Sequence, residues 1–197
     1  LIPMVLLAAR YGGWALLLPP VTAWWLFTFL DVLLGQNHEN PDLATEDSEL
    51  FWYRLITLIW FPIQFVLQFG LIWWAARTGT LAGWEKLGLF FGVGVISGTI
   101  GIVYAHELLH QRNRLERWLG DLLLASVLYS HFRSEHLLVH HRHVGTPRDA
   151  VTARYNEGFH RFFVRVLAEC PPSAFRAERA LLARKGLPWW SRRNPRY

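Results

Sequence analysis

Long apolar runs without charged residues alternate with polar segments over the first 110 residues of the chain. The complete runs are Trp14–Leu30, with 17 residues, Leu55–Ala76, with 22, and Leu87–Ala105, with 19. A helix rises about 1.5 Å per residue, so about 20 apolar residues cross the hydrocarbon core of a bilayer. The pattern therefore predicts three membrane-spanning helices. Leu1–Ala9 is apolar but too short to span, and we interpret it as the end of a helix whose beginning is missing.

Small and polar residues inside these runs indicate that the helices pack against one another. Two tandem repeats, which begin at Gly88 and Gly94, place glycines four residues apart, and this spacing lets another helix approach closely. Gln64 and Gln68 are expected to face other helices, because lipid offers no hydrogen-bond partner. A tight turn is predicted at Arg10–Gly13.

The chain changes character after residue 112. Trp118–Phe132 is apolar but contains Asp121 and is too short for a span, so we expect one helix that is buried against the others or lies at the membrane interface. No segment beyond Arg133 is apolar enough to cross a bilayer. Gly145–Pro147 and Pro171–Pro172 are typical of turns. The predicted fold class is all-α, a polytopic membrane helical bundle.

The charged residues orient this bundle. Of the 20 Lys and Arg residues, 16 lie between residues 112 and 196, against seven acidic residues in the same stretch. Basic residues gather at the cytoplasmic ends of membrane helices. We therefore expect one integrated domain in two parts: residues 1–111 as transmembrane helices, with the first span truncated, and residues 112–197 as a helical region on the cytoplasmic side with a basic tail. The loop at 77–86 is then outside.

The excess of basic over acidic residues also indicates which molecules the protein binds. The formal net charge is +5, which by itself is compatible with nucleic-acid binding. No nucleic-acid-binding fold pattern accompanies the arginines, and contact with anionic lipid headgroups explains them in a membrane protein. We expect membrane lipid and no nucleic acid as a partner.

Eight of the nine histidines lie between residues 106 and 160. His106 and His110, in the motif His-Glu-Leu-Leu-His, are four residues apart and point the same way on a helix. His136 and His140 repeat this spacing, and His141 is expected roughly 100° further round the same helix. These five imidazoles are one more than a tetrahedral ion uses, and they are the candidate metal ligands.

The small number of cysteines also limits which kinds of metal site are possible. The single cysteine, Cys170, excludes a cysteine metal site. Imidazole-rich ligation suits iron, copper, zinc or nickel, and the number of ligands favours two ions. A histidine-rich metal site on the cytoplasmic side follows.

Other residues near the histidines are candidates for orienting the ligands. Glu107 and Glu135 adjoin ligands and are expected to orient them or to bind metal through oxygen. Asp149 either holds the second ring nitrogen of a ligand or caps a turn. His131 and His143 flank the cluster, and we interpret them as partners of ligands or as surface residues.

The motif at His106–His110 also occurs in zinc metalloproteases, where its glutamate is the general base. Intramembrane proteases of this kind add a later Asn-Pro-Asp-Gly or Leu-Asp-Gly motif. The only approximation, Asn40–Leu43, lies upstream and lacks the glycine. The second histidine cluster favours a polynuclear site over this alternative. A non-catalytic membrane-anchoring or metal-storage protein is a further alternative.

The histidine motifs resemble those of the integral-membrane alkane monooxygenases. The chain matches the first histidine box, the second box with its tail, and the first cytoplasmic connection of that family. These matches are His106–His110 with Arg117–Trp118; His131–Phe132, Glu135–His136 and His140–His141; Thr146–Asp149 with Ala153–Arg154; and Gly35–Pro41. Fatty-acid desaturases and sterol or fatty-acid hydroxylases share the chemistry but match the tail of the second box poorly.

This resemblance implies an enzyme that hydroxylates the terminal methyl group of n-alkanes or similar hydrocarbon chains. It further implies a non-haem di-iron site that uses O2, electrons from rubredoxin and rubredoxin reductase, and a place in a bacterial inner membrane. The alternatives are another histidine-box hydroxylase or desaturase that acts on fatty acyl chains and, less favoured, the intramembrane zinc metalloprotease.

The chain departs from the family pattern in two respects. Val139 stands where the family usually has glycine, just before the paired histidines. The family's Asn-Tyr-x-x-His-Tyr-Gly stretch and its third box, Gln-Arg-His-x-x-x-His-His, do not occur in the sequence. We therefore expect an incomplete chain, with the last spans and the remaining ligands beyond Tyr197, and no hydroxylase activity from these 197 residues alone.

Overall fold

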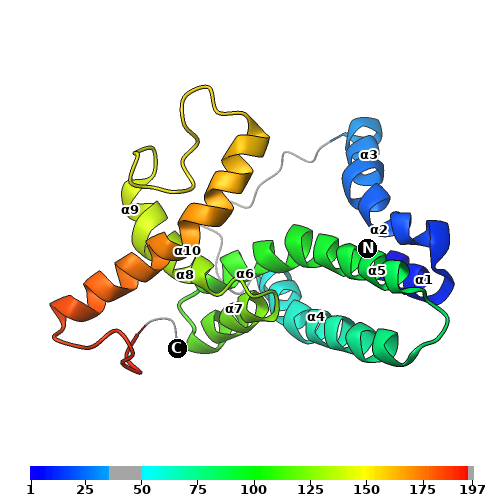
Figure 1. The fold of residues 1–197 in the computed structure, drawn as a ribbon, viewed down its shortest axis with the longest axis horizontal. Coiled ribbons are helices and arrows are strands. Elements are labelled where there is room, and N and C mark those ends of the chain that lie inside the picture. Colours follow the sequence, from blue (N-terminus) through cyan, green and yellow to red (C-terminus); the bar gives the residue numbers. More distant parts are fainter. Residues whose placement is uncertain (36–49, 195–197) are drawn as a thin grey trace. The chain divides into compact units, whose positions relative to one another are not determined.

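The computed structural model describes residues 1–35 and 50–194, which fall into two compact units. Unit 1 is Leu1–Ser126 and unit 2 is Val127–Tyr197. Every regular element in the described residues is helical, as predicted (Figure 1). The division predicted at residue 111 concerns the side of the membrane and stays a prediction. The matches at Gly35–Pro41 and Asn40–Leu43 involve residues 36–49, outside the described residues.

Three helical rods of unit 1 are long and apolar enough to cross a membrane. They are Gly13–Leu34, Phe51–Arg77 and Gly83–Leu109, with 22, 27 and 27 residues. Each contains one of the predicted apolar runs and extends it at both ends, so the three predicted spans are confirmed.

The rods are built from regular helix interrupted by tighter and wider turns. After α1 (Ile2–Tyr11), the first rod comprises a 3-10 turn (Gly13–Leu17), α2 (Leu18–Val21), a π-helical turn (Thr22–Leu26) and α3 (Phe27–Leu34). The second rod is α4 (Phe51–Arg77). The third comprises α5 (Gly83–Ile96), a π-helical turn (Ser97–Gly101) and α6 (Ile102–Leu109).

The turn predicted at Arg10–Gly13 joins α1 to the first rod. Gly12 and Gly13 have positive φ angles of 60° and 49°, which glycine adopts without strain. The backbone N–H groups of Gly13 and Ala82 both donate to the Glu85 carboxylate, at 2.7 and 2.8 Å. This carboxylate therefore ties the start of α5 to the turn.

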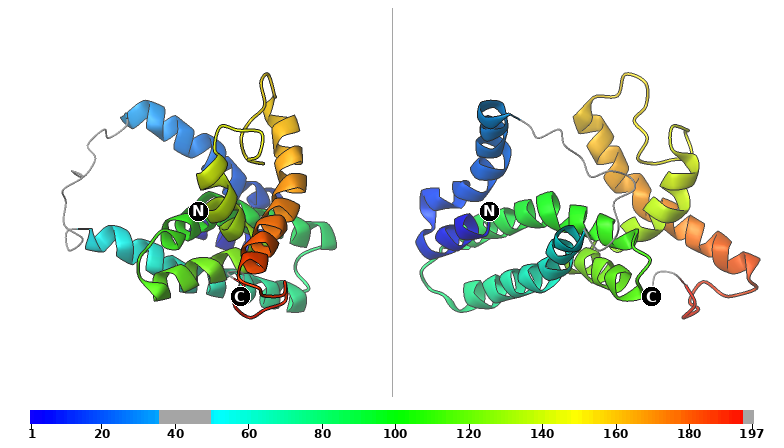
Figure 2. Two further views of the ribbon diagram at one scale, coloured as in Figure 1. Left: turned by 90° about the vertical axis from the view of Figure 1, so that its left-hand side faces the viewer. Right: turned by 180° about the vertical axis from the view of Figure 1, so that it is seen from behind.

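The second and third rods run antiparallel and are joined by the short loop 78–82 (Figure 1 and Figure 2). α7 (Arg114–Ser126) packs on α4 and on α6. Gln64, which is 2% exposed, accepts a hydrogen bond from Trp60 Nε1 at 2.9 Å and donates to Ser126 Oγ at 3.3 Å. Gln68 Nε2 donates to the Ser126 carbonyl oxygen at 2.7 Å. Both glutamines face other helices, as predicted.

The two glycine repeats of the third rod differ in their surroundings. A Cβ on Gly88 would lie 3.2 Å from Leu16, and one on Gly92 would lie 3.0 Å from Pro19. The first repeat is therefore a place of close helix approach, as predicted. Among the described residues, nothing lies within 4 Å of a Cβ on either glycine of the repeat that begins at Gly94, so the second repeat makes no such contact.

The single helix predicted over Trp118–Phe132 is wrong. α7 ends at Ser126, and Leu128 has a positive φ of 58°, a conformation that does not continue a right-handed helix. Helical structure resumes at His131. The part that forms α7 is nevertheless buried against its neighbours, as expected.

Unit 2 consists of a helical segment that carries the second histidine cluster, a loop, and one long helix. The segment runs through α8 (His131–Ser134), a π-helical turn (Glu135–His140) and α9 (His141–His143). The long helix α10 (Phe159–Arg184) packs against α8 and the π-turn. The intervening loop begins with the turn predicted at Gly145–Pro147, where φ at Gly145 is 79°.

The turn predicted at Pro171–Pro172 is wrong, because both prolines lie inside α10. Proline lacks an N–H donor and weakens a helix interior. Buried side chains nevertheless continue at helical spacing across the prolines, from Cys170 to Leu182. Since tertiary packing of such a face supplies most helix stability, packing against the histidine-bearing segment outweighs the local preference.

Candidate metal centre

In unit 1, the end of the third rod presents the first pair of candidate ligands. His106 lies on α6 and His110 is at its C-terminal cap. Their ring centroids are 4.8 Å apart, as expected for residues about one turn apart on one face. His106 Nδ1 lies 3.2 Å from Oε1 of Glu107, so this carboxylate is in position to orient the His106 ring.

In unit 2, the three candidate ligands converge because the backbone departs from a regular α-helix. Glu135–His140 is a π-helical turn, in which backbone hydrogen bonds link residues five apart. His136 and His141 therefore meet, with their Nε2 atoms 2.9 Å apart and their ring centroids 4.5 Å apart. An ordinary α-helix would place His141 roughly 100° further round than His140. The contact of His141 with His136 shows that this expectation is wrong.

His140 completes the group and is held by Asp149. The His140 ring stacks on His136 with centroids 5.4 Å apart, and its Nδ1 lies 2.9 Å from Oδ2 of Asp149. The Thr152 hydroxyl and the Val151 N–H also donate to this carboxylate, at 2.6 and 3.1 Å. Asp149 thus contacts the His140 ring and also caps a turn, and its role beside a metal ligand stays a prediction.

The environment of Asp149 keeps its side chain ionised. The side chain is fully buried, and burial opposes ionisation. The hydrogen bonds from Thr152, His140 and Val151 outweigh burial and hold the pKa of Asp149 below its ordinary value. A carboxylate accepts the proton on Nδ1, which leaves Nε2 of His140 as the free donor atom for a metal.

The loop that carries Asp149 is held by a residue that sequence reasoning missed. Arg165 on α10 donates to the carbonyl oxygens of Ala150 and Thr152, at 2.7 and 3.1 Å. It also pairs with Glu157 at 2.7 Å. The Arg165 hydrogen bonds lower the pKa of Glu157 to about 2, and the Glu157 carboxylate raises the pKa of Arg165. In the sequence Arg165 is one of 16 basic residues after residue 111. Its spacing to Glu169, with which it pairs on α10, gives no sign of its contact with the loop.

Glu135 is buried, with 2% of its surface exposed. Within the described residues, neither of its carboxylate oxygens forms a hydrogen bond of normal geometry. Burial raises the pKa of Glu135, and the neighbouring Ser173 hydroxyl and Arg176 guanidinium oppose this shift only in part. Buried polar groups are normally satisfied, so a carboxyl group in this state fits a position beside a bound cation. Its predicted role as an orienting or ligating group stays a prediction.

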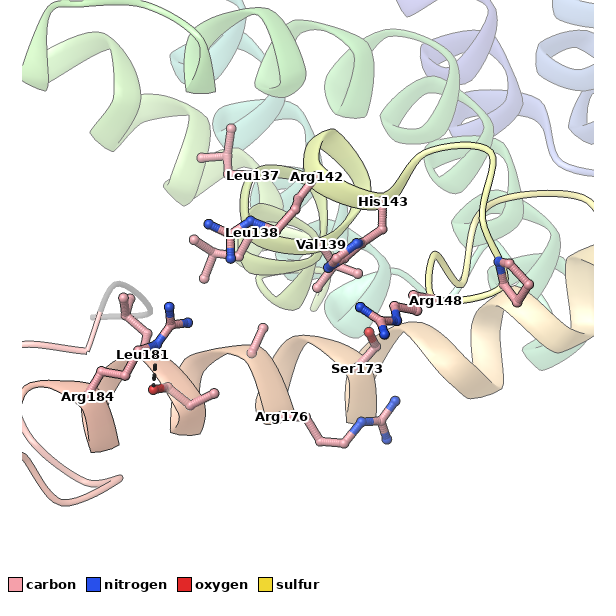
Figure 3. Close-up of a pocket in the computed structure, with 13 residues that line it drawn as sticks. Leu137, Leu138, Val139, Arg142, His143, Arg148, Ser173, Arg176, Leu181 and Arg184 are labelled. Carbon is pink, nitrogen blue, oxygen red and sulfur yellow. Dashed lines mark hydrogen bonds between the residues drawn. The ribbon is translucent and has the colours of Figure 1, made fainter.

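The flanking histidines occupy other surroundings. His131 packs edge-on against Tyr129, with ring centroids 4.6 Å apart. His143 lines a pocket that faces α10, together with Val139 (Figure 3). Val139, which replaces the usual glycine, is buried.

The donor atoms fit a metal bound by imidazole. Nitrogen atoms 2.9 Å apart, as in His136 and His141, are close enough to share one ion at the usual metal–nitrogen distance of about 2.0–2.1 Å. Cys170 is buried, and burial raises its pKa to about 12. Its thiol therefore stays protonated, and a metal takes up a thiolate rather than a thiol. The assignment of individual ligands stays a prediction.

Comparison with known proteins agrees with the histidine motifs. The model of the fatty acid desaturase family matches residues 78–197. Alkane 1-monooxygenase 2 of Pseudomonas aeruginosa is 33% identical over 92% of this chain and 58% of its own length. Alkane 1-monooxygenase 1 of the same organism is 36% identical over 82% of this chain and 45% of its own length. The xylene/toluene monooxygenase hydroxylase component XylM of Pseudomonas putida is 26% identical over 100% of this chain and 53% of its own length.

The chain spans about half the length of these curated relatives. The predicted resemblance to alkane monooxygenases is confirmed by their similarity, and these matches are to monooxygenases and to the desaturase family. The family match covers more than half of the chain and includes both histidine clusters. Together with three apolar rods of spanning length, these findings show that the chain is an integral membrane protein that belongs to the fatty acid desaturase family.

Proposed function

We propose that the whole protein is a membrane monooxygenase that hydroxylates the terminal methyl group of n-alkanes or similar hydrocarbon chains. The names of its relatives support this activity, since they describe enzymes that act on alkanes, xylene and toluene. The structural observation that carries the proposal is the convergence of His136, His140 and His141 on one side of the π-turn. Such a cluster of neutral nitrogen donors suits a redox metal.

The proposed cofactor is a pair of non-haem iron ions, held by His106, His110, His136, His140 and His141 together with ligands from the rest of the protein. When bound, iron supplies the chemistry by which one atom of O2 enters a C–H bond and the other leaves as water, with two electrons and two protons consumed. Asp149 keeps the proton on Nδ1 of His140, so that Nε2 is presented to the metal. Arg165 fixes the loop that positions Asp149.

The proposed electron donors are rubredoxin and rubredoxin reductase, and the proposed location is a bacterial inner membrane with the metal site on the cytoplasmic side. The basic excess after residue 111 supports this orientation. It also supports attraction of an acidic electron carrier, whose association rate falls as salt rises.

The second candidate function is hydroxylation or desaturation of fatty acyl chains. The description of the matching family as fatty acid desaturase favours it. Both candidates use the same histidine ligands, so their products distinguish them.

The decisive experiment expresses the protein from its natural gene in a bacterium that lacks alkane oxidation, with rubredoxin and its reductase. Cells receive a medium-chain n-alkane and oxygen-18 O2, and products are identified by mass spectrometry. We expect labelled primary alcohol, together with iron in the purified protein. His140→Ala should lose both, whereas His160→Ala, an exposed histidine at the start of α10, should keep both. Unsaturated acyl chains without labelled oxygen would favour the second candidate.

A further inference from the structure

A pocket of about 600 Å³ in unit 2 is lined by the segment that carries the second histidine cluster, the following loop and α10 (Figure 3). Arg142 and Arg148 come from the segment and the loop, and Arg176 and Arg184 come from α10. Apolar side chains form much of the remaining wall, including Leu137 on the segment and Leu181 on α10. The pocket therefore combines concentrated positive charge with an apolar surface.

The four arginines of the pocket form no ion pair within the described part of the chain. No acidic side chain lines the pocket, and no carboxylate among the described residues forms an ion pair with any of its four arginines. Asp149 binds His140, and Glu157 and Glu169 bind Arg165. Glu135 does not line the pocket, but its carboxylate interacts electrostatically with Arg176. Four guanidinium groups gathered around one pocket without an ion pair attract an anion from outside the chain.

The chemistry of the lining indicates the kind of anion. Guanidinium groups match the geometry of phosphate oxygens with paired hydrogen bonds. A free phosphate ion gains nothing from leucines, whereas a phospholipid places its glycerol and acyl carbons against them. The volume suits a small ligand, while a docked protein covers a broader surface.

We propose that this pocket binds the phosphate headgroup of an anionic phospholipid. Unit 1 anchors the chain in the bilayer, so lipid is always at high local concentration. A bound headgroup contacts arginines of both walls and thereby holds α10 against the segment that carries His136, His140 and His141. The site is distinct from the proposed metal ligands, and its occupation does not depend on the proposed reaction.

The test measures lipid retained by the full chain, purified in a neutral detergent and analysed by native mass spectrometry. Phosphatidylglycerol is compared with zwitterionic phosphatidylcholine. Arg142→Gln/Arg184→Gln removes one arginine from each wall, and Arg161→Gln/Arg179→Gln removes two exposed arginines of α10 outside the pocket. We expect the pocket variant to bind phosphatidylglycerol at least about tenfold more weakly, since each arginine near a headgroup contributes about a factor of five. The matched control should change less than about twofold.

Three outcomes would overturn the proposal. Equal losses in the two double variants would mean that overall charge, not the pocket, binds lipid. Displacement of the lipid by inorganic phosphate at equal concentration would mean a site for a free anion. Polyglutamate binding that depends on Arg142 and Arg184, without selective retention of phosphatidylglycerol, would mean a site for an acidic protein. Arg142→Lys/Arg184→Lys keeps the charge and should restore part of the affinity, which separates lost binding from misfolding.

Discussion

The hydrogen bond between His140 and Asp149 illustrates how a single buried carboxylate sets the state of a candidate ligand. An ionised Asp149 accepts the Nδ1 proton, and the neutral ring then offers Nε2. The amide of Asn has nearly the same shape but can donate to Nδ1 instead. The ring would then carry its proton on Nε2, where it blocks coordination.

We therefore expect Asp149→Asn to weaken metal binding by about 10- to 100-fold, measured as metal retained against a graded chelator. Thr152→Val is the matched control, because it removes another hydrogen bond to the same carboxylate without changing the tautomer of His140. It should weaken retention by less than about threefold. Equal losses would show that Asp149 acts only as a turn cap.

The pair formed by Glu157 and Arg165 predicts how the loop responds to acid. The folded state lowers the pKa of Glu157 to about 2, below an unfolded value of about 4.3. Its contribution to stability is thus fully present above the unfolded pKa and is lost as the pH falls through that window toward about 2. Glu157→Gln lacks this contribution at every pH.

Hydrogen exchange of the amides in loop 144–158 measures the effect. The variant should exchange faster than the wild type above about pH 5, and the difference should shrink as the pH approaches 2. Asp31→Asn, which changes an exposed carboxylate of unit 1, should leave the loop unaffected. A difference that stays constant across this pH range would contradict the assignment.

For individual residues, the sequence predicted those contacts that follow from the spacing of residues along a helix. His106 and His110 lie together because four residues make about one helical turn, and Asp149 meets a histidine as one of its two expected roles requires. The contact of Arg165 with the Asp149 loop was not predicted, because Ala150 and Thr152 accept its hydrogen bonds through backbone carbonyl oxygens. Every residue offers the same acceptor, so no sequence pattern marks them.

At the scale of helices, the contact of α7 with α6 depends on one glycine. A Cβ on Gly120 would lie 3.0 Å from the Ala105 carbonyl oxygen and 3.0 Å from Leu108 Cβ. Neither is the end of a flexible side chain, so the helices must separate. Gly120→Ala is expected to destabilise unit 1 by about 1–3 kcal/mol, measured by unfolding in detergent.

Gly94→Ala is the control on a neighbouring helix, because a Cβ there meets nothing within 4 Å among the described residues. It should be neutral or stabilising by up to about 1 kcal/mol. Similar destabilisation by both substitutions would show that helix contact at Gly120 is not the cause.

Helices could be predicted from the sequence where a long apolar run marks them. They were missed where packing against other residues decides whether the chain is helical. The three spans follow from long runs without charge, so their existence was clear even though each predicted end was short by one to four residues. Pro171–Pro172 belongs to a helix because a buried face that runs from Cys170 to Leu182 crosses it. The break after Ser126 depends on the backbone of Leu128, a residue type that gives no sign of a turn.

At the scale of the whole molecule, the orientation in the membrane is the prediction most open to test. Cys170 is the only cysteine in the chain, so Cys170→Ser provides a background for single-cysteine labelling. Thr80→Cys, in the loop between α4 and α5, should react with an impermeant maleimide added to intact spheroplasts. Arg192→Cys should react only after the membrane is permeabilised. Both positions are exposed, and the reverse pattern would place the basic region outside.

The π-turn at Glu135–His140 also bears on how this protein can be engineered. A π-helical turn contains one residue more than an ordinary α-helical turn. It is therefore equivalent to an α-helix into which one residue has been inserted. A deletion of one residue there restores the ordinary backbone ladder and separates His136 from His141. Screens that reward heat resistance alone will therefore tend to enrich shortened, inert chains, and libraries built on this scaffold need selection for retained metal alongside melting temperature.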